Sequence, residues 1–273
     1  MKKLVVLLAG MMLMATMQVH AESNVKGNVI NQSVNTGSTN VAIGQGNKAD
    51  VGSIGIENST VKGGVVNQSA NSGSANVAIG KDNKASMGAV SIKDSNVNGQ
   101  VLNRAVNSGS ANVAIGQGNK ASMGSIDIKG SNVKGNVVNQ SVNSGSANVA
   151  IGQGNKANMG SVGIKNARVN GTVVNQSLNS GSANVAIGQG NTANMGSVGI
   201  KNASVNGTVV NQSLNSGSAN VAIGQGNTAN MGSVGIENAN VQGTIVNQSN
   251  NVGSANVAIG KDNEANMGSI GIK

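Results

Sequence analysis

The fold of this chain is set by the sequence NVAIGQGNKADVG, residues 40–52. Variants of it recur every 36 residues, without insertion or deletion in any copy. The later copies begin at Asn76, Asn112, Asn148, Asn184, Asn220 and Asn256. A strict period of this kind is typical of stacked repeats, in which each copy forms one structural unit. The chain is therefore predicted to be a pile of equivalent layers.

Period-2 alternation of apolar with small or polar residues within each copy predicts strands. Val29 and Ile30 are adjacent and must face opposite sides, so we expect both sides of that strand to be covered. Turn-forming residues at 35–38 and 45–47 divide each copy into about three short strands. The alternation also predicts an inward-facing core stripe, made by Val41, Ile43, Ile79, Ile115, Ile151, Ile187, Ile223 and Ile259.

The predicted fold class is therefore all-β: a parallel, in-register β-solenoid of seven stacked repeats. Aligned layers place identical side chains about 4.8 Å apart, so Asn amides can form hydrogen-bonded ladders. One predicted ladder is Asn31, Asn67, Asn103, Asn139, Asn175, Asn211 and Asn247. A second is Asn40, Asn76, Asn112, Asn148, Asn184, Asn220 and Asn256. Gln32 and its equivalents form a third, which Arg104 interrupts.

The composition agrees with thin layers. The chain has 273 residues, of which 41 are Gly, and it contains no Phe, Tyr, Trp, Pro or Cys. Aromatic side chains normally supply much of the area buried in a wide core. The aliphatic side chains of this chain can fill only a narrow space between closely spaced backbones. Without Cys no disulfide is expected, and stability must come from backbone pairing and packing.

Residues 1–21 are predicted to be a secretory signal peptide, because a basic start is followed by an apolar run too short to span a membrane. Cleavage is expected after Ala21. The 252 residues that follow equal seven times 36, and removal of Lys2 and Lys3 lowers the formal charge from +9 to +7. The repeats are 22–57, 58–93, 94–129, 130–165, 166–201, 202–237 and 238–273. Neither the first nor the last resembles a cap, so open, uncapped ends are expected.

Catalytic chemistry is not indicated. His and Cys are both absent after residue 21, and the carboxylates are scattered singly, so we expect neither an enzyme nor a bound metal or cofactor. The Gly-rich stretch 44–48 lacks the strand and helix that define a phosphate loop. The positive charge favours incidental contact with matrix polyanions. Without aromatic residues no stacking platform exists, and sequence-specific nucleic-acid binding is not expected.

Residues 38–47, STNVAIGQGN, together with Ala49 and the apolar residues of 54–56, resemble the repeats of Fap-type bacterial functional amyloid subunits. The overall plan is similar to that of curli subunits. This resemblance implies export through the periplasm of a Gram-negative bacterium by outer-membrane secretion machinery. It also implies that a nucleator starts the growth of extracellular fibrils, which act in the biofilm matrix and in surface adhesion. The chain lacks the long linkers and terminal Cys pair of Fap-type subunits. NVAIG is also similar, more weakly, to head repeats of trimeric autotransporter adhesins, which are much shorter.

Two functions therefore compete. The first is a secreted structural protein that polymerises with itself, end to end, into cross-β fibrils. The alternative is a discrete, monomeric β-solenoid adhesin or binding module on the cell surface. An enzyme and an ice-binding solenoid are less favoured, the latter because no regular Thr array is present. The sequence leaves open whether a repeat makes one rung or two and whether the chain is a major or a nucleating subunit.

Overall fold

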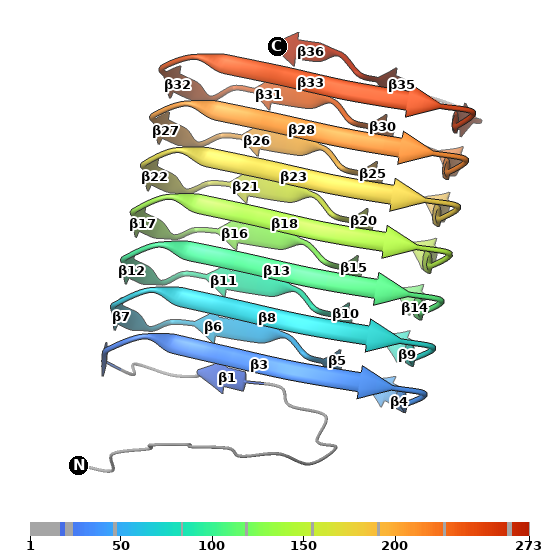
Figure 1. Ribbon diagram of the computed structural model, residues 1–273, viewed down its shortest axis with the longest axis horizontal. Coiled ribbons are helices and arrows are strands. Elements are labelled where there is room, and N and C mark those ends of the chain that lie inside the picture. Colours follow the sequence, from blue (N-terminus) through green and yellow to red (C-terminus); the bar gives the residue numbers. More distant parts are fainter. Residues whose placement is uncertain are drawn as a thin grey trace.

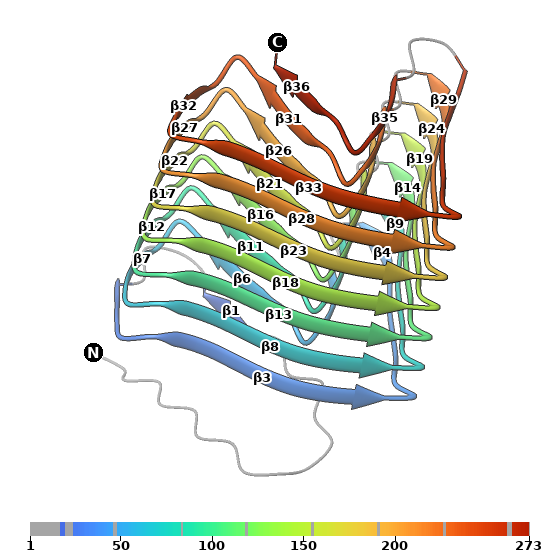
Figure 2. The same ribbon diagram turned by 45° about the horizontal axis from the view of Figure 1, so that its top comes forward.

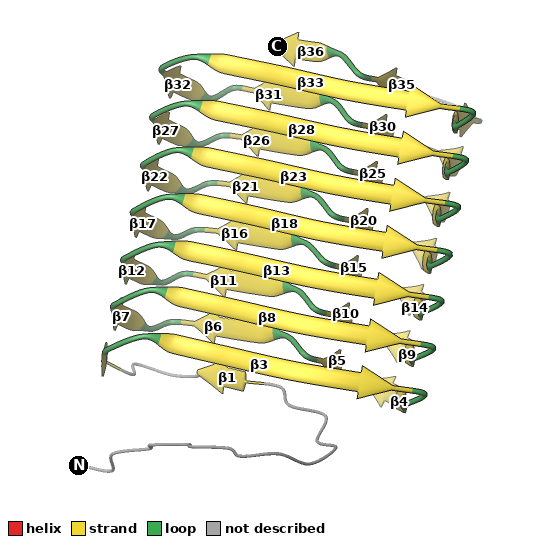
Figure 3. Cartoon of the chain, in the orientation of Figure 1, coloured by secondary structure: helices red, strands yellow, loops and turns green. Residues whose placement is uncertain are grey.

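A computed structural model describes residues 17–19, 24–45, 48–82, 84–117, 120–153, 156–189, 192–225, 228–260 and 264–272. All regular secondary structure within these residues is β-strand (Figure 3). The predicted cleavage site at Ala21 and most of the predicted signal peptide lie outside the described residues. A search of the described part of the chain for a helix long and apolar enough to cross a membrane finds none.

Each 36-residue repeat forms one rung of a parallel β-solenoid, and the rungs pile up in chain order (Figure 1). A rung contains five strands, and equivalent strands of successive rungs form five parallel sheets. The pairing is in register: Asn103 lies between Asn67 on one side and Asn139 on the other. The predicted fold class is confirmed, with one rung per repeat.

We name each sheet by its strand in the first rung. The β2 sheet contains β2 (Asn24–Lys26), β7 (Thr60–Lys62), β12 (Asn96–Asn98), β17 (Asn132–Lys134), β22 (Arg168–Asn170), β27 (Ser204–Asn206) and β32 (Asn240–Gln242). The β3 sheet, which has the longest strands, contains β3 (Val29–Thr36), β8 (Val65–Ser72), β13 (Val101–Ser108), β18 (Val137–Ser144), β23 (Val173–Ser180), β28 (Val209–Ser216) and β33 (Ile245–Val252).

The chain then turns back through two further sheets. The β4 sheet contains β4 (Thr39–Gln45), β9 (Ala75–Lys81), β14 (Ala111–Gln117), β19 (Ala147–Gln153), β24 (Ala183–Gln189), β29 (Ala219–Gln225) and β34 (Ala255–Ile259). The β5 sheet contains β5 (Lys48–Val51), β10 (Lys84–Met87), β15 (Lys120–Met123), β20 (Lys156–Met159), β25 (Thr192–Met195), β30 (Thr228–Met231) and β35 (Glu264–Met267).

The β6 sheet closes each rung and has one additional strand. It contains β1 (Met17–Val19), β6 (Ile54–Glu57), β11 (Val90–Lys93), β16 (Ile126–Lys129), β21 (Val162–Lys165), β26 (Val198–Lys201), β31 (Val234–Glu237) and β36 (Ile270–Ile272). Strand β1 pairs with β6 at an offset of 37 residues, Met17 with Ile54, whereas β6 and β11 are offset by 36. It therefore covers the outer edge of β6 without completing a rung.

The five strands differ from the three expected, because additional corners cut the predicted segments. Gly27 has a φ of 139° and separates β2 from β3, while Gly52 has a φ of 59° and separates β5 from β6. Both values lie in the region that glycine adopts at little cost. A Cβ at Gly52 would collide with the Ser33 side chain, so this corner also needs close approach to the β3 sheet.

The interior has three parts, which differ in the size of their buried side chains. Between the β2, β3 and β6 sheets lies an aliphatic core built from the equivalents of Val29, Ile54 and Ile56. Between the β4 and β5 sheets the buried apolar residues are alanines, such as Ala114 and Ala121, so these two sheets pack closely. A third column, at the end of the β5 sheet, is made of Val51, Met87, Met123, Met159, Met195 and Met231.

Candidate functional site

The first predicted ladder lies on the inner face of the β3 sheet. Each Asn from Asn31 to Asn211 donates a hydrogen bond from Nδ2 to the Oδ1 of its equivalent in the next rung, at 2.8–2.9 Å. The five central members are fully buried. Burying an amide is costly unless its polar atoms are paired, and the stacked register supplies that pairing from rung to rung.

The second predicted ladder joins two sheets as well as successive rungs. Asn40 and its equivalents donate to the next Asn at 2.8–3.3 Å. The same amides also reach backbone carbonyls of the β5 sheet, for example Asn76 to Ser86 at 2.9 Å and Asn148 to Asn158 at 2.8 Å. These bonds hold the β4 and β5 sheets at the short separation that their alanines allow.

The structure contains a further buried ladder that the sequence did not lead us to predict. Asn35 and its equivalents bond to one another at 2.6–2.9 Å, and those of the five central rungs are at most 2% exposed. Its invariance and its four-residue distance from Asn31, which places both on one face of a strand, are the signals that could have found it. On the outer face the Gln32 ladder forms at 2.9–3.0 Å, and Arg104 Nε donates to Gln140.

The predicted core stripe is corrected by the structure. The stripe residues Val41, Ile43, Ile79 and Ile259 are exposed, by 50, 67, 37 and 54%. The others, Ile115, Ile151, Ile187 and Ile223, are half-buried on the same outer face. The inward residues of this strand are Asn40 and Ala42, because the amide must reach the β5 backbone and the narrow gap accepts only alanine.

The expectation that both sides of β3 are covered is also wrong. Val29 is 4% exposed, but Ile30 is 48% exposed and Val34 is 70% exposed on the opposite face. No other described strand lies over that face, because the chain folds back on its Val29 side alone (Figure 2). The solenoid therefore carries an uncovered apolar stripe along the β3 sheet.

The two ends of the stack differ in what they expose. At the C-terminal end Ile270 is 48% exposed and Ile272 is 68% exposed, whereas Val198 and Ile200, their equivalents two rungs earlier, are each 1% exposed. At the N-terminal end Ile54 and Ile56 are 1% exposed, and β1 lies beside them (Figure 1). Strand edges and core side chains thus lie open at the last rung, and β1 partly covers the first.

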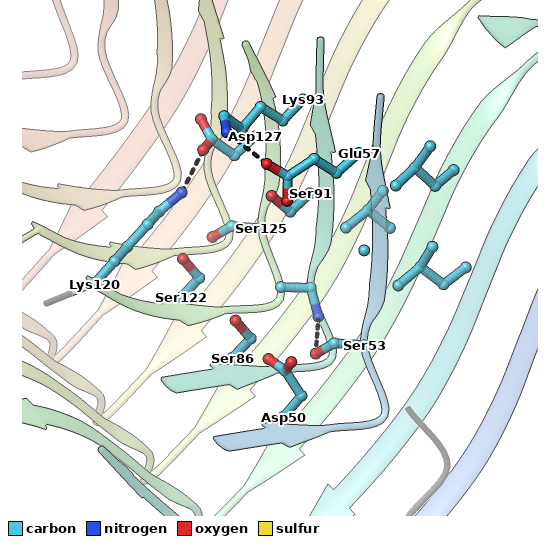
Figure 4. A pocket seen from close by; sticks show the side chains of 15 residues that line it. Asp50, Ser53, Glu57, Ser86, Ser91, Lys93, Lys120, Ser122, Ser125 and Asp127 are labelled. Carbon is cyan, nitrogen blue, oxygen red and sulfur yellow. Dashed lines mark hydrogen bonds and ion pairs between the residues drawn. The ribbon is translucent and has the colours of Figure 1, made fainter. Parts of the chain in front are cut away.

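A charged groove follows the concave side, where the β5 and β6 sheets meet at an angle (Figure 4). Lys120 pairs with Asp127 at 2.5 Å across the groove. Lys93 pairs with Glu57 in the preceding rung at 2.5 Å. The Glu57 carboxylate accepts a hydrogen bond from Lys93 and attracts its charge, which raises the pKa of Lys93 above its ordinary value. The described residues contain no cluster of His, Cys, Asp or Glu able to hold a metal ion.

The geometry defines a class of protein, the parallel β-solenoid with open ends and buried Asn ladders. No protein-family model matches the chain, and neither a curated protein nor a solved structure matches it. The function must therefore be argued from the ladders, the open edges and the outer faces.

Proposed function

We propose that this protein is a secreted structural subunit that self-assembles end to end into extracellular cross-β fibrils. The observation that carries the proposal is the identical, in-register pattern of the rungs at the two ends. The strands of the last rung expose one edge, and in the first rung β2, β3, β4 and β5 expose the opposite edge of the same parallel sheets, while β6 pairs with β1. Unprotected edges of this kind pair readily with further strands.

The ladders give such an association a direction. In the Asn31 ladder each Asn from Asn31 to Asn211 donates toward the C-terminal end of the stack. Asn247 of one copy would therefore meet Asn31 of the next in the same donor-to-acceptor sense. The reverse arrangements, with two first rungs or two last rungs in contact, would turn the strands antiparallel and break the register. Head-to-tail growth is thus the geometry in which a junction repeats the interior of the stack.

Burial favours the junction as well. Ile270 and Ile272 are 48 and 68% exposed at the last rung, whereas their equivalents one rung earlier, Val234 and Ile236, are at most 4% exposed. Another rung placed on them would remove these side chains from water, and full burial of one aliphatic side chain is worth about 1.5–3 kcal/mol. The same rung would also pair the free edges of the backbone strands, as in cross-β fibrils.

The test is growth of fibres from purified protein. Residues 22–273 at rising concentration are expected to bind an amyloid dye and to form unbranched fibres in electron micrographs. The full chain, in which β1 covers the first β6 edge, is expected to need a higher concentration. Stacks that stay monomeric at every concentration, with no fibres, would contradict the proposal.

The wider setting follows from the same proposal. A secreted polymer of this kind would form in biofilm matrix or at the cell surface, and its export would require outer-membrane machinery, with a nucleator to start growth. The leader predicted at residues 1–21 and the uniform, linker-free repeats support this setting. Deletion of the gene is expected to remove the fibres and to weaken surface attachment, and complementation should restore both.

The alternative, a discrete binding module, is favoured by one observation, the groove between the β5 and β6 sheets. Lys129, Lys165 and Lys201 line it at successive heights, opposite the amide ladder Asn158, Asn194 and Asn230. Such a groove offers a linear acidic polymer repeated cationic and amide contacts. Salt-sensitive binding of an anionic polysaccharide by monomeric protein, with no fibres, would support this alternative.

A further inference from the structure

The outer face of the β3 sheet is an uncovered, regular and nearly uncharged surface. Aliphatic residues occupy the position of Ile30 in all seven rungs and the position of Val34 in six, with the Gln32 ladder between them. The most exposed large apolar residues of this face, beyond Ile30 and Val34, are Val106, Leu214 and Val252. Of the residues in the seven described strands of this sheet, Arg104 alone is charged.

This face is ridged along the stack. The Gln ladder and the aliphatic column beside it form two parallel ridges with a shallow groove between them. The groove runs past Gln140, Val142, Gln176 and Leu178 and extends from the third rung to the seventh, and a second depression with the same lining continues over the first rungs. Figure 1 shows the sheet as a broad outer wall with no element over it. Because the groove lies beside an aliphatic ridge on each copy, this face is complementary to the same face of a second copy.

We propose that two copies pair laterally through this face. A two-fold axis parallel to the stack relates them, so that the rungs of both copies lie at the same heights. The Val34-type ridge of each copy then lies in the groove of the other, with opposite strand directions across the interface. Such an isologous contact is closed, and interdigitated side chains between two sheets form the dry interface known from stacked β-structures.

The area is sufficient for a stable pair. Eight residues at about 3.3 Å each make the face about 26 Å wide, and seven rungs make it about 33 Å tall. Each copy therefore covers about 860 Å², or about 1,700 Å² in total, which is the standard size for a specific interface. A third copy cannot bind to the same face once two copies are paired. The contact therefore produces a pair of stacks side by side and no branched assembly.

Other outer faces are less suited. The β5 and β6 faces carry the charged groove with Lys120, Asp127 and Lys201. The β4 face is also apolar, but its strands are shorter and its central valines and isoleucines are half-buried. A matched pair of substitutions in one rung tests which of the two apolar faces makes the contact. They are Val142→Lys on the β3 face and Val149→Lys on the β4 face.

Both substitutions should leave the solenoid intact, because Arg104 shows that the outer face of a rung accommodates a cation. Circular dichroism and the denaturation midpoint of each variant check this. If fibres form, mass per length from scanning transmission electron microscopy is expected to give two chains per about 33 Å for the original protein and for Val149→Lys, and one for Val142→Lys. Arg104→Gln, which completes the Gln ladder, is expected to tighten lateral pairing.

Lateral pairing does not depend on end-to-end growth, and sedimentation velocity separates the two. Dimers that Val142→Lys splits, in a protein that forms no fibres, would support the pairing and contradict the fibril. One chain per about 33 Å in fibres of the original protein would overturn the pairing alone. Loss of pairing in Val149→Lys but not in Val142→Lys would also overturn it, because the contact would then lie on the β4 face.

Discussion

At the scale of single residues, the buried amides are the groups that specify this fold. Asn139 is fully buried, accepts from Asn103 and donates to Asn175, both at 2.9 Å. A shift of one rung by one residue would place an aliphatic or a glutamine opposite these atoms and leave them unpaired. The ladders therefore penalise wrong registers more than they add net stability, because an unmade buried hydrogen bond costs more than a made one contributes.

Asn139→Ala is expected to destabilise the protein by about 2–4 kcal/mol, because it leaves the Asn103 donor and the Asn175 acceptor buried without partners. Urea denaturation measures the change. Gln140→Ala is the matched control, since its ladder lies on the outer face where water can replace the lost bonds, and it should cost less than about 1 kcal/mol. An equal loss of unfolding free energy in the two variants would show that the buried ladder contributes no more to stability than the exposed one.

The Lys93–Glu57 pair predicts a small pH dependence. Glu57 raises the pKa of Lys93, so the pair contributes stability fully below the ordinary lysine value of 10.5, and the contribution is lost as the pH rises through the raised value. Because the Lys93 side chain is 46% exposed, solvent screens the effect. The stability advantage over Glu57→Gln should therefore be constant up to about pH 10 and should shrink above it. An advantage that stays constant or grows above that pH would contradict the assignment.

At the scale of the strand, the corners decide how many elements a rung has. Gly160 and Gly145 both have positive φ, 60° and 55°, but they differ in their surroundings. A Cβ at Gly160 would meet the hydroxyls of Ser141 and Ser177, whereas nothing lies within 4 Å of one at Gly145. Gly145 is therefore needed only because of its backbone conformation. Gly160 is needed for its backbone conformation and also because the site has no room for a Cβ atom.

Gly145→Ala should cost about 1–2 kcal/mol, the price of the left-handed conformation. Gly160→Ala should cost about 1–3 kcal/mol more, because the added methyl overpacks the junction between the β3 and β5 sheets. Thermal denaturation of both variants at equal concentration measures the difference. A Gly160→Ala variant as stable as Gly145→Ala would mean that the serine column moves aside without cost.

The sequence predicted the stack and its register but not the inner face of every strand. The 36-residue period requires equivalent rungs, whatever each strand does. In NVAIG both faces carry apolar residues, and bulk favoured Val41 and Ile43 as the core. What decides the face is the partner sheet, which lies close enough for Ala42 and for the Asn40 amide. That distance is a tertiary property, and no pattern within one strand encodes it.

At the scale of the whole molecule, the repeats should be interchangeable. Each rung contacts only its neighbours, so stability is approximately the sum of rung and interface contributions. Deleting residues 138–173 joins Val137 to Val174 inside the β3 sheet and recreates the native sequence of that strand. Deleting residues 138–172 removes one residue fewer and joins Val137 to Val173, which inserts one additional valine into the same strand.

The 36-residue deletion is expected to unfold cooperatively, with a urea m-value lower by about one seventh, because m follows the surface exposed on unfolding and one rung of seven is gone. The 35-residue deletion should be much less stable. Its additional residue either bulges out of the strand or turns Asn175, Ser177 and Asn179 outward and the aliphatic ridge inward. Far-ultraviolet circular dichroism and urea titration distinguish the two proteins. Similar stability in both would mean that the rungs are not held in register by their side chains.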